Sequence, residues 1–383
     1  MSEKINLLGC SLESLEGFFI NLQEPKFRAK QLLKWIHQKG VLDFDLMTDF
    51  NKDLRKKLSS VALIEPPKIY QEYISEEGTI KYLIQLRSGS MIEMVVIPEK
   101  NRRTLCVSSQ AGCALQCTFC ATGAQGFDQN LGSHEIIGQL WLANFYKNNS
   151  KPITNVVFMG MGEPLLNYDA VIESAKIMKD QLSYGLSRKR ITISTSGIVP
   201  NINKLPKDID VSLAISLHAA EDKLRNEIVP INNKYPIKSL IQSCKDYLDY
   251  FQNKRNITIE YILIDGVNDS IEHATKLTKL LSDISCKINL IPFNSFPGSN
   301  YKRPSNNKIG AFKKYLMSKG LIATLRVTRG DGVDAACGQL VGNLSSSIKG
   351  KNLICVFVDN GLLRKGEADE VMDTFESQMP VSY

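Results

Sequence analysis

Three closely spaced cysteines are the residues in this chain best suited to chemistry. Cys113, Cys117 and Cys120 form a C-x3-C-x2-C pattern in a loop that directly follows an apolar segment. Thiolates at this spacing suit a soft metal or an iron-sulfur cluster. A structural zinc site usually adds a second cysteine pair or two spaced histidines, and neither is present here. We therefore expect a cluster with one open iron. A zinc site and three incidental buried cysteines are the alternatives.

Length, charge and cysteine usage set the class of protein. The chain has 383 residues, and its 47 Lys and Arg against 40 Asp and Glu give a net charge of +7. This moderate excess favours a polyanionic partner without requiring one. The nine cysteines are scattered and odd in number, unlike a secreted disulfide framework, and the N-terminus lacks the apolar region of a signal peptide. Since no apolar run is long enough to span a membrane, we expect a cytoplasmic protein.

The first part of the chain predicts a small domain, residues 1–98. Helical periodicity covers 11–19 and 27–37, and the second of these helices carries basic residues opposite an apolar stripe. The periodicity then changes to that of strands. Turns of the Glu-Glu-Gly and Ser-Gly-Ser type separate three expected strands, which predict a β-meander over 69–74, 79–86 and 91–97.

From residue 104 onward, strand and helix patterns alternate. Strands are expected at 104–108, 155–159, 190–195, 211–217, 257–264 and 287–293, with a weaker seventh candidate at 323–328. Helices are expected at 133–147, 168–181, 236–253, 270–284 and 305–319, the first of them with Ser133 as N-cap. This alternation predicts an α/β fold with a parallel sheet, either open or closed into a complete or partial barrel. In both cases the chemistry belongs at the carboxyl ends of the strands.

Distinctive motifs follow these expected strands. The cysteine loop follows the first, Gly160-Met-Gly-Glu-Pro164 the second, Ser194-Thr-Ser-Gly197 the third and Ser216-Leu-His218 the fourth, with Ile291-Pro-Phe-Asn294 and Asp334-Ala-Ala-Cys-Gly-Gln-Leu340 further on. In combination they resemble the radical S-adenosylmethionine (SAM) methyltransferases of the RlmN type, over residues from about 5 to 340. The resemblance implies a partial (β/α)6 barrel over 99–340, preceded by the helical and β-meander domain. The activity it implies is methylation of carbon 2 of adenine in 23S rRNA and tRNA.

The resemblance also assigns the cofactors. Cys113, Cys117 and Cys120 would hold one [4Fe-4S] cluster, whose open iron binds the amino and carboxylate groups of SAM, and two SAM molecules would be used per turnover. Carbon 2 of adenine is not nucleophilic, so the methyl transfer needs such one-electron chemistry. The positions that match the family's contacts to SAM are Gly162 and Glu163 for its methionine part, Ser194, Ser216, Leu217 and His218 for its nucleoside, and Asn294. Taken alone, His218 fits equally well an ordinary hydrogen-bonded histidine at the end of a strand.

Three further residues match reacting groups of the family. Cys337 matches the methyl carrier, which is first methylated by SAM and then, after loss of a hydrogen from its S-methyl group, adds to adenine. Cys106 matches the resolving cysteine, which forms a transient disulfide with Cys337 and so releases the product. Glu93 matches the acceptor of the adenine proton. Without the resemblance, Cys106 reads as a buried strand cysteine, and Glu93 fits equally well the exposed face of an alternating strand.

Partners and rival functions follow from the same comparison. Basic clusters around residues 28–34, 55–57, 102–103 and 188–190 modestly support contact with RNA phosphates. The family also implies an electron donor such as flavodoxin or ferredoxin, and we expect a monomer. One rival is a Cfr-type enzyme, which methylates carbon 8 of adenine in 23S rRNA. The other, from a different class, is a non-catalytic zinc-dependent RNA-binding module.

The segment 341–383 does not belong to this pattern. Residues 350–371 resemble a strand and helix from the ATP pyrophosphatase domain of GMP synthetase, but the phosphate-binding S-G-G-x-D-S loop of that domain is absent. We therefore expect no second activity. We also expect only weak contact between this tail and the barrel, because its charged helical part has few apolar residues to bury.

Overall fold

The structure, a computed structural model, describes residues 4–148, 151–252, 254–326 and 338–341. Of the predicted site residues, Cys337 lies outside these ranges. So does the tail after Val341, with the predictions made for it. One compact unit spans Met1–Asn343 and contains all the elements described below.

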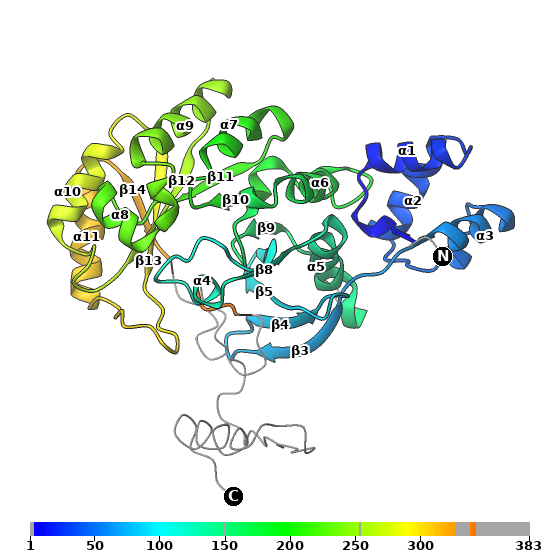
Figure 1. The fold of residues 1–383 in the computed structure, drawn as a ribbon, viewed down its shortest axis with the longest axis horizontal. Helices are drawn as coiled ribbons and strands as arrows, with labels where there is room; N and C mark the ends of the chain where they lie inside the picture. Colours follow the sequence, from blue (N-terminus) through cyan, green and yellow to red (C-terminus); the bar gives the residue numbers. More distant parts are fainter. Residues whose placement is uncertain (1–3, 149–150, 253, 327–337, 342–383) are drawn as a thin grey trace, which may run out of the picture. The chain divides into compact units, whose positions relative to one another are not determined.

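Three amphipathic helices form the first part of this unit, α1 (Leu12–Asn21), α2 (Phe27–His37) and α3 (Lys52–Val61). Ser11 caps α1 and Asn51 caps α3, each accepting a hydrogen bond from a backbone N–H in the first turn. Their apolar faces pack together, and the residues buried there include Leu15, Phe19, Leu32, Leu54 and Leu58. Figure 1 shows the three helices grouped at one end of the unit, as the blue segment.

Within the described residues, a sheet of ten strands forms the centre, in the order β14-β13-β12-β11-β10-β9-β6-β5-β4-β3. The strands are β3 (Lys68–Ile74), β4 (Ile80–Gln85), β5 (Met91–Glu99), β6 (Arg102–Cys106), β9 (Asn155–Phe158), β10 (Ile191–Thr195), β11 (Ser212–Ser216), β12 (Ile257–Leu263), β13 (Cys286–Pro292) and β14 (Ile322–Leu325). From β6 to β14 every pairing is parallel, whereas β3, β4, β5 and β6 pair antiparallel. The expected meander and parallel strands are confirmed, including the seventh candidate.

The meander is hydrogen-bonded directly to the parallel strands. Antiparallel pairing of β5 with β6 matches Val95 with Cys106, and β6 then pairs in parallel with β9. The expected helical and meander part therefore shares one continuous sheet with the α/β part. The domain boundary expected at residue 98 would fall inside β5 of that sheet, and this boundary stays a prediction.

Helices cover the parallel strands. They are α5 (Ser133–Phe145), α6 (Tyr168–Lys179), α7 (Val199–Asp208), α8 (Asp222–Ile228), α9 (Ile237–Tyr250), α10 (Ile271–Leu280) and α11 (Asn306–Ser318). Figure 1 shows α7, α9, α10 and α11 along the outer side of β10 to β14. Helix α7 was not predicted from the sequence; Pro200 occupies its first turn and Pro206 lies inside it.

The expected cap of α5 is wrong. Gly132 occupies the N-cap position, and its N–H donates to the Glu135 carboxylate at 2.9 Å. Ser133 is the first residue of the helix, and its hydroxyl donates instead to the carbonyl of Gly9 at 2.8 Å. This bond ties α5 to the 3-10 turn over Leu7–Gly9, so a long-range contact has replaced the local one.

Short elements complete the unit. These are β1 (Ile5–Asn6), β2 (Ala62–Leu63), β7 (Gln110–Gly112), α4 (Ala121–Gln125), β8 (Phe127–Asn130) and the 3-10 turns η1 (Leu7–Gly9), η2 (Phe44–Leu46), η3 (Tyr146–Asn148), η4 (Pro164–Leu166), η5 (Arg188–Arg190) and η6 (Pro230–Asn233). Within the described ranges, no helix combines the length and the apolar character that crossing a bilayer requires.

Candidate active site

A cavity at the carboxyl ends of the parallel strands brings the predicted motifs together. Its lining includes Cys113, Cys117, Cys120, Gly162, Glu163, Ser194, Ser216 and His218. Apolar side chains such as Phe158, Ile262 and Ile291 form other parts of the wall. Four further predicted residues, Glu93, Cys106, Leu217 and Asn294, are buried but do not line this cavity.

A small antiparallel ladder closes the cysteine loop. Strands β7 and β8 pair Gly112 with Phe127, and the N–H of Cys113 donates to the carbonyl of Gly126 at 2.7 Å. Gly112 has a φ of +70°, and a Cβ there would lie 1.9 Å from the Gly126 oxygen. Only glycine therefore allows the two ends of the loop to approach so closely.

Two of the three thiols lie in a setting that disfavours their ionisation in the absence of a cation. Burial raises the pKa of Cys113 to about 12. The pKa of Cys117 is raised well above its usual value, first by burial and then by the neighbouring Cys120 and Cys113. The positive charge of bound metal would offset both causes, because metal ligands must be thiolates.

The donor set fits an iron-sulfur cluster. Among the residues that the structure describes, no three His, Cys, Asp or Glu side chains converge closely enough to bind a single metal ion. In a cluster, cysteine thiolates bind separate iron atoms and so need not converge on one point. The cysteines, with Glu163 and His218, face a common cavity in which a cluster and SAM would be held.

The glycines of the Gly160-Met-Gly-Glu-Pro164 turn allow close backbone contact. A Cβ on Gly160 would lie 2.7 Å from the backbone of Val107, next to β6. Gly162 has a φ of +95°, and a Cβ there would lie 2.5 Å from the side chain of Gln110. That side chain accepts a hydrogen bond from the N–H of Glu163 at 2.8 Å. Gln110 was not predicted as a site residue. It lies on β7, the strand before the cysteine loop, and it holds the Gly160–Pro164 turn against that strand.

Glu163 is a buried carboxylate at the cavity wall. Its Oε2 accepts from the N–H of Ser196 at 2.8 Å, and its Oε1 accepts from the N–H of Leu165 at 3.1 Å. Burial raises its pKa, while these backbone hydrogen bonds oppose the rise. Such an oxygen pair suits an ammonium group, which is the part of SAM that the sequence analysis assigned to this residue.

His218 is held as a neutral imidazole. Burial lowers its pKa to about 3, with a smaller contribution from Arg225. Its Nδ1 accepts from the N–H of Ile262 at 3.1 Å, so the proton is on Nε2, which can donate. The ring also packs edge-on against Phe119, with 4.7 Å between ring centroids. His218 is therefore both a hydrogen-bonded strand-end histidine and a residue of the cavity.

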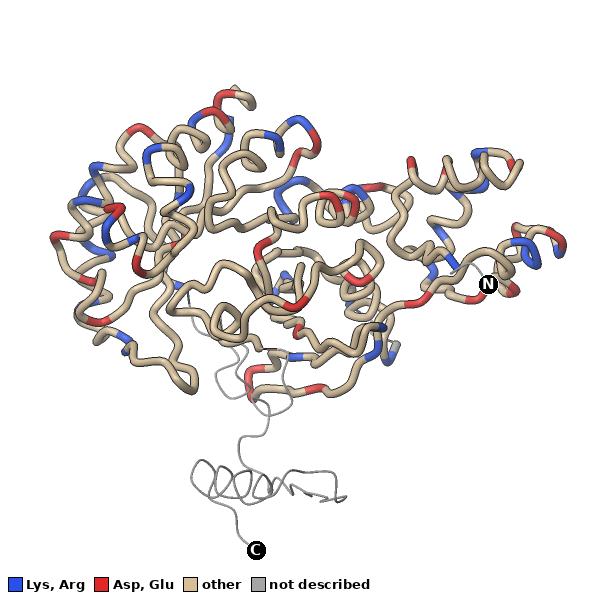
Figure 2. The backbone as a smooth tube through the Cα atoms, in the orientation of Figure 1, with Lys and Arg blue, Asp and Glu red and all other residues tan. Residues whose placement is uncertain are grey.

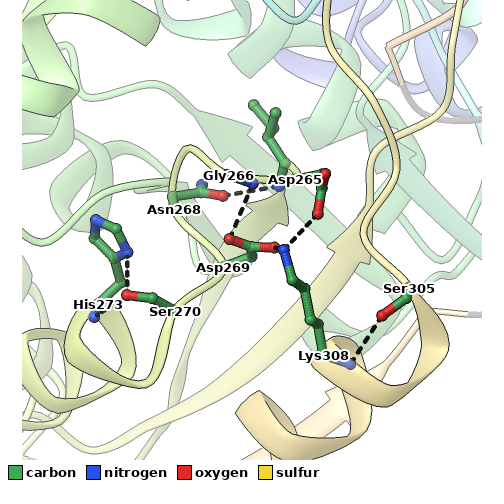
Figure 3. Close-up of polar contacts among 9 residues, drawn as sticks. Asp265, Gly266, Asn268, Asp269, Ser270, His273, Ser305 and Lys308 are labelled. Carbon is green, nitrogen blue, oxygen red and sulfur yellow. Dashed lines mark hydrogen bonds and ion pairs between the residues drawn. The ribbon is translucent and has the colours of Figure 1, made fainter.

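A loop after β12 supports the backbone of His218, which has a φ of +62°. Asn268 donates to the His218 carbonyl at 2.9 Å and to the Ile262 carbonyl at 2.6 Å, and accepts from the N–H of Ile264 at 2.8 Å. Lys308 on α11 holds the same loop through Asp265 at 2.7 Å and Asp269 at 3.2 Å (Figure 3). Asn268 was not predicted from the sequence, because nothing in its local pattern points to a partner fifty residues away.

Arg225 was also missed, although it is fully buried beside the site. Its guanidinium donates to the carbonyls of Leu217 at 2.9 Å, Ser196 at 2.6 Å and Ser216 at 3.1 Å, and to Asn232 at 2.8 Å. It thus fixes the ends of β10 and β11. Burial lowers its pKa to about 10. In the sequence, Arg225 lies in a polar helical segment and looks exposed.

Glu260 on β12 was missed as well. It is buried, lines the cavity and accepts from the Nδ2 of Asn289 at 3.1 Å. A signal for it did exist, because a single acidic residue interrupts the otherwise apolar end of that strand.

The residues that directly follow Cys337 are bonded to the site. The N–H of Ala121 donates to the Gly338 carbonyl at 2.8 Å, and the Thr122 hydroxyl donates to the Leu340 carbonyl. Gln339 donates to the Ser295 carbonyl at 2.8 Å. Ala121 and Thr122 directly follow Cys120, so the chain next to Cys337 is attached to the cysteine loop.

Two predicted reacting groups lie on neighbouring strands of the sheet, β6 and β5. Cys106, at the end of β6, is 6% exposed. Glu93 on β5 is fully buried, so its reading as the exposed face of an alternating strand is wrong. The Oε2 of Glu93 accepts from the N–H of Val341 at 3.1 Å, which connects β5 with the segment after Cys337.

Comparisons with known proteins agree with this geometry. Residues 5–64 match the ribosomal RNA large subunit methyltransferase N-terminal domain, and residues 107–278 match the radical SAM superfamily. A radical SAM methyltransferase from Sphaerobacter thermophilus is 39% identical, with a TM-score of 0.83 over 88% of this chain and 100% of that one.

Curated relatives extend the match over most of the chain. The dual-specificity RNA methyltransferase RlmN of Pseudomonas putida is 56% identical over 347 residues, which cover 89% of this chain and 91% of the relative. The protein of the same name from Pseudomonas fluorescens is 53% identical over 346 residues. The chain therefore belongs to the RlmN family of radical SAM RNA methyltransferases.

Proposed function

We propose that this protein methylates carbon 2 of adenine in 23S rRNA and tRNA, with Cys337 as carrier of the methyl group. The observation that carries the proposal is the cavity at the strand ends. Its wall brings the three cysteines together with most of the residues assigned to SAM and with the segment directly after Cys337. When bound there, the [4Fe-4S] cluster and two SAM molecules supply the methyl group and the one-electron chemistry that an unactivated ring carbon needs.

The residues of the chain bind and orient these groups in the proposal. Cys113, Cys117 and Cys120 hold the cluster. Glu163 accepts hydrogen bonds from the ammonium of SAM, and the Nε2–H of His218 donates to its nucleoside. Ser194 and Ser216, whose hydroxyl oxygens lie 3.5 Å apart, contact the same nucleoside from neighbouring strands. Gly162 adds a contact from the cavity wall. Leu217 and Asn294, which are buried behind that wall, complete the proposed set.

The proposed sulfur chemistry uses two cysteines. Cys337 receives a methyl group on its sulfur and, through that carbon, becomes bonded to carbon 2 of adenine. Glu93 takes the proton that carbon 2 loses. The thiolate of Cys106 then attacks the sulfur of Cys337. A disulfide forms, the sulfur-carbon bond breaks with its electrons going to carbon, and that carbon takes up a proton to become the methyl group of the released adenine. A cellular thiol must reduce this disulfide before the next turnover.

The surface supports RNA contact only in a general way. Figure 2 shows Lys and Arg spread over the helices and intermixed with Asp and Glu. RNA binding would therefore use several small groups of positive charge together with the shape of the RNA. We further propose flavodoxin or ferredoxin as electron donor, a monomeric protein, and a cytoplasmic location, where the RNA substrates are found.

One experiment tests this function. Protein purified and reconstituted without oxygen would be incubated with SAM, a reductant and either a 23S rRNA fragment or tRNA, and the digested nucleosides analysed by mass spectrometry. We expect a brown protein with about four irons per chain and new 2-methyladenosine. Formation of 8-methyladenosine would instead support the Cfr-type reaction. A colourless zinc protein without a modified nucleoside would refute an enzymatic role.

A further inference from the structure

The sheet buries an ion pair next to the proposed site. The Nζ of Lys81 on β4 lies 3.1 Å from the Oε1 of Glu93 on β5, and the two side chains are 1% and 0% exposed. Removing two charges from water costs more than most such pairs return in stability. A pair in this position therefore calls for an explanation beyond the stability of the sheet.

Strand register places this pair on the same face as Cys106. Lys81 is directly opposite Val95, and Val95 is directly opposite Cys106. Residues opposite each other in antiparallel strands point to the same face, as do residues two apart in one strand. Glu93 is two residues before Val95, so Lys81, Glu93 and Cys106 share one face.

The carboxylate of Glu93 is fixed at both oxygens. Lys81 contacts Oε1, and the N–H of Val341 donates to Oε2. The backbone around it is fixed as well, because the Ser108 hydroxyl donates to the Glu93 carbonyl at 2.6 Å. Glu93 therefore points toward the described residues 338–341, which follow Cys337 in the sequence.

We propose that Lys81 is a positioning residue for the methylation: its ammonium keeps Glu93 ionised and aimed at the segment after Cys337, ready to take the proton from carbon 2 of adenine. This inference rests on the proposed function of the site. Once the adduct has lost the one electron that the cluster would take back, the C–H bond at carbon 2 breaks, its electrons stay with the ring, and the proton goes to an oxygen of Glu93. Lys81 itself keeps its protons and touches no reactant.

The surroundings of Glu93 explain why an ammonium is needed. Near Glu93, the titratable groups that the register of the described strands places on its face are Lys81, Cys106 and Tyr73, which is directly opposite Lys81. Of these, Lys81 carries the positive charge. A buried carboxyl group that loses its cation takes up a proton, and a protonated carboxyl group cannot accept another.

The test replaces Lys81 by methionine, which has a similar length and no charge. In Lys81→Met, Cys337 should still be methylated by SAM, because that step does not use Glu93. Proton removal should fail next, so a covalent RNA-protein adduct should accumulate. The acid limb of the pH profile for 2-methyladenosine formation should move up by about one to three pH units, with a rate at least about tenfold lower at neutral pH that recovers as pH rises.

Three measurements follow these steps: mass spectrometry of the protein for methyl-Cys337, gel analysis of the RNA adduct, and nucleoside analysis across the pH range. The matched control is Lys147→Met, which removes the exposed Lys147–Glu72 pair with its 2.8 Å distance and should change none of them. Lys81→Arg keeps the positive charge and should keep the wild-type pH profile even where its larger side chain lowers the rate.

Several outcomes would overturn the inference. An unchanged pH profile in Lys81→Met would do so, as would a shifted profile in Lys81→Arg. Loss of Cys337 methylation in Lys81→Met would show that the lysine serves only folding. If the wild-type protein methylates Cys337 but makes no 2-methyladenosine, the proposed function itself is wrong. The wild-type result therefore distinguishes an error in the proposed function from an error in the role of Lys81 alone.

Discussion

Asn268 offers the sharpest test of how the site is supported. Its side chain is fully buried and makes three hydrogen bonds, two to carbonyls and one from the N–H of Ile264. Asn268→Ala removes all three bonds and leaves their partners buried. At about 1 kcal/mol for each bond, the free energy of unfolding should fall by about 3 kcal/mol. That loss is large against a total of about 5 to 15 kcal/mol for a folded domain.

The same substitution should weaken SAM binding. Without Asn268, the carbonyl of His218 loses a bond that holds its left-handed backbone conformation, so the Nε2–H is no longer aimed at the cavity. We expect affinity for SAM to fall about tenfold, which corresponds to about 1.4 kcal/mol. Titration calorimetry on the reconstituted protein would measure this loss, and urea unfolding followed by circular dichroism would measure stability.

Asn233→Ala is the matched control. The Asn233 side chain makes one exposed hydrogen bond, to the carbonyl of Pro230 at 3.0 Å. Its removal should cost less than about 0.5 kcal/mol and leave SAM affinity unchanged. If Asn268→Ala also cost less than about 1 kcal/mol, the three buried bonds would not support the loop as argued.

Three further outcomes are expected. Cys106→Ala should leave RNA covalently attached to the protein on a denaturing gel, whereas Cys337→Ala should form neither adduct nor product; normal turnover of Cys106→Ala would remove its resolving role. A chain ending after residue 345 should keep its iron content and its methylation activity, and loss of either would show that the tail contributes to the working fold. Burial lowers the pKa of both His37 and His218 to about 3, so below about pH 6.5 the unfolded chain binds protons that the folded chain does not. As the pH is lowered below this value, the free energy of unfolding should therefore decrease by up to about 1.4 kcal/mol per pH unit for each histidine. Denaturant titrations would measure this slope, and His37→Phe should remove the part that His37 contributes.

Local patterns predicted most of the scaffold. Alternation of apolar strands with amphipathic helices predicted the parallel sheet, and turn residues predicted the meander. The prediction of helix caps failed where a distant contact competed with a local one. At Ser133, the hydroxyl donates to the carbonyl of Gly9 instead of capping α5. Helix prediction also failed for α7, because two prolines obscure the helical periodicity.

The residues of the candidate site that belong to short local motifs could be predicted from the sequence. The cysteine spacing and the Gly160–Pro164 turn could be read directly, and the cavity unites them. The supporting residues could not be read in this way. Arg225, Asn268 and Lys81 gain their roles from partners on other elements, and a charged or amide side chain in a polar segment usually lies in solvent.

The order of strands in the central sheet has a consequence for how the protein is made. Apart from the separate β7–β8 ladder, each strand neighbours the one that precedes it along the chain, from β3 to β14. As the ribosome releases the chain, every new strand can therefore pair at once with the strand before it, and the sheet grows from a single edge. Cys337 follows the last of these strands and leaves the ribosome after all of them. If Cys337 carries the methyl group as proposed, its thiol becomes available only when every strand of the central sheet can already pair.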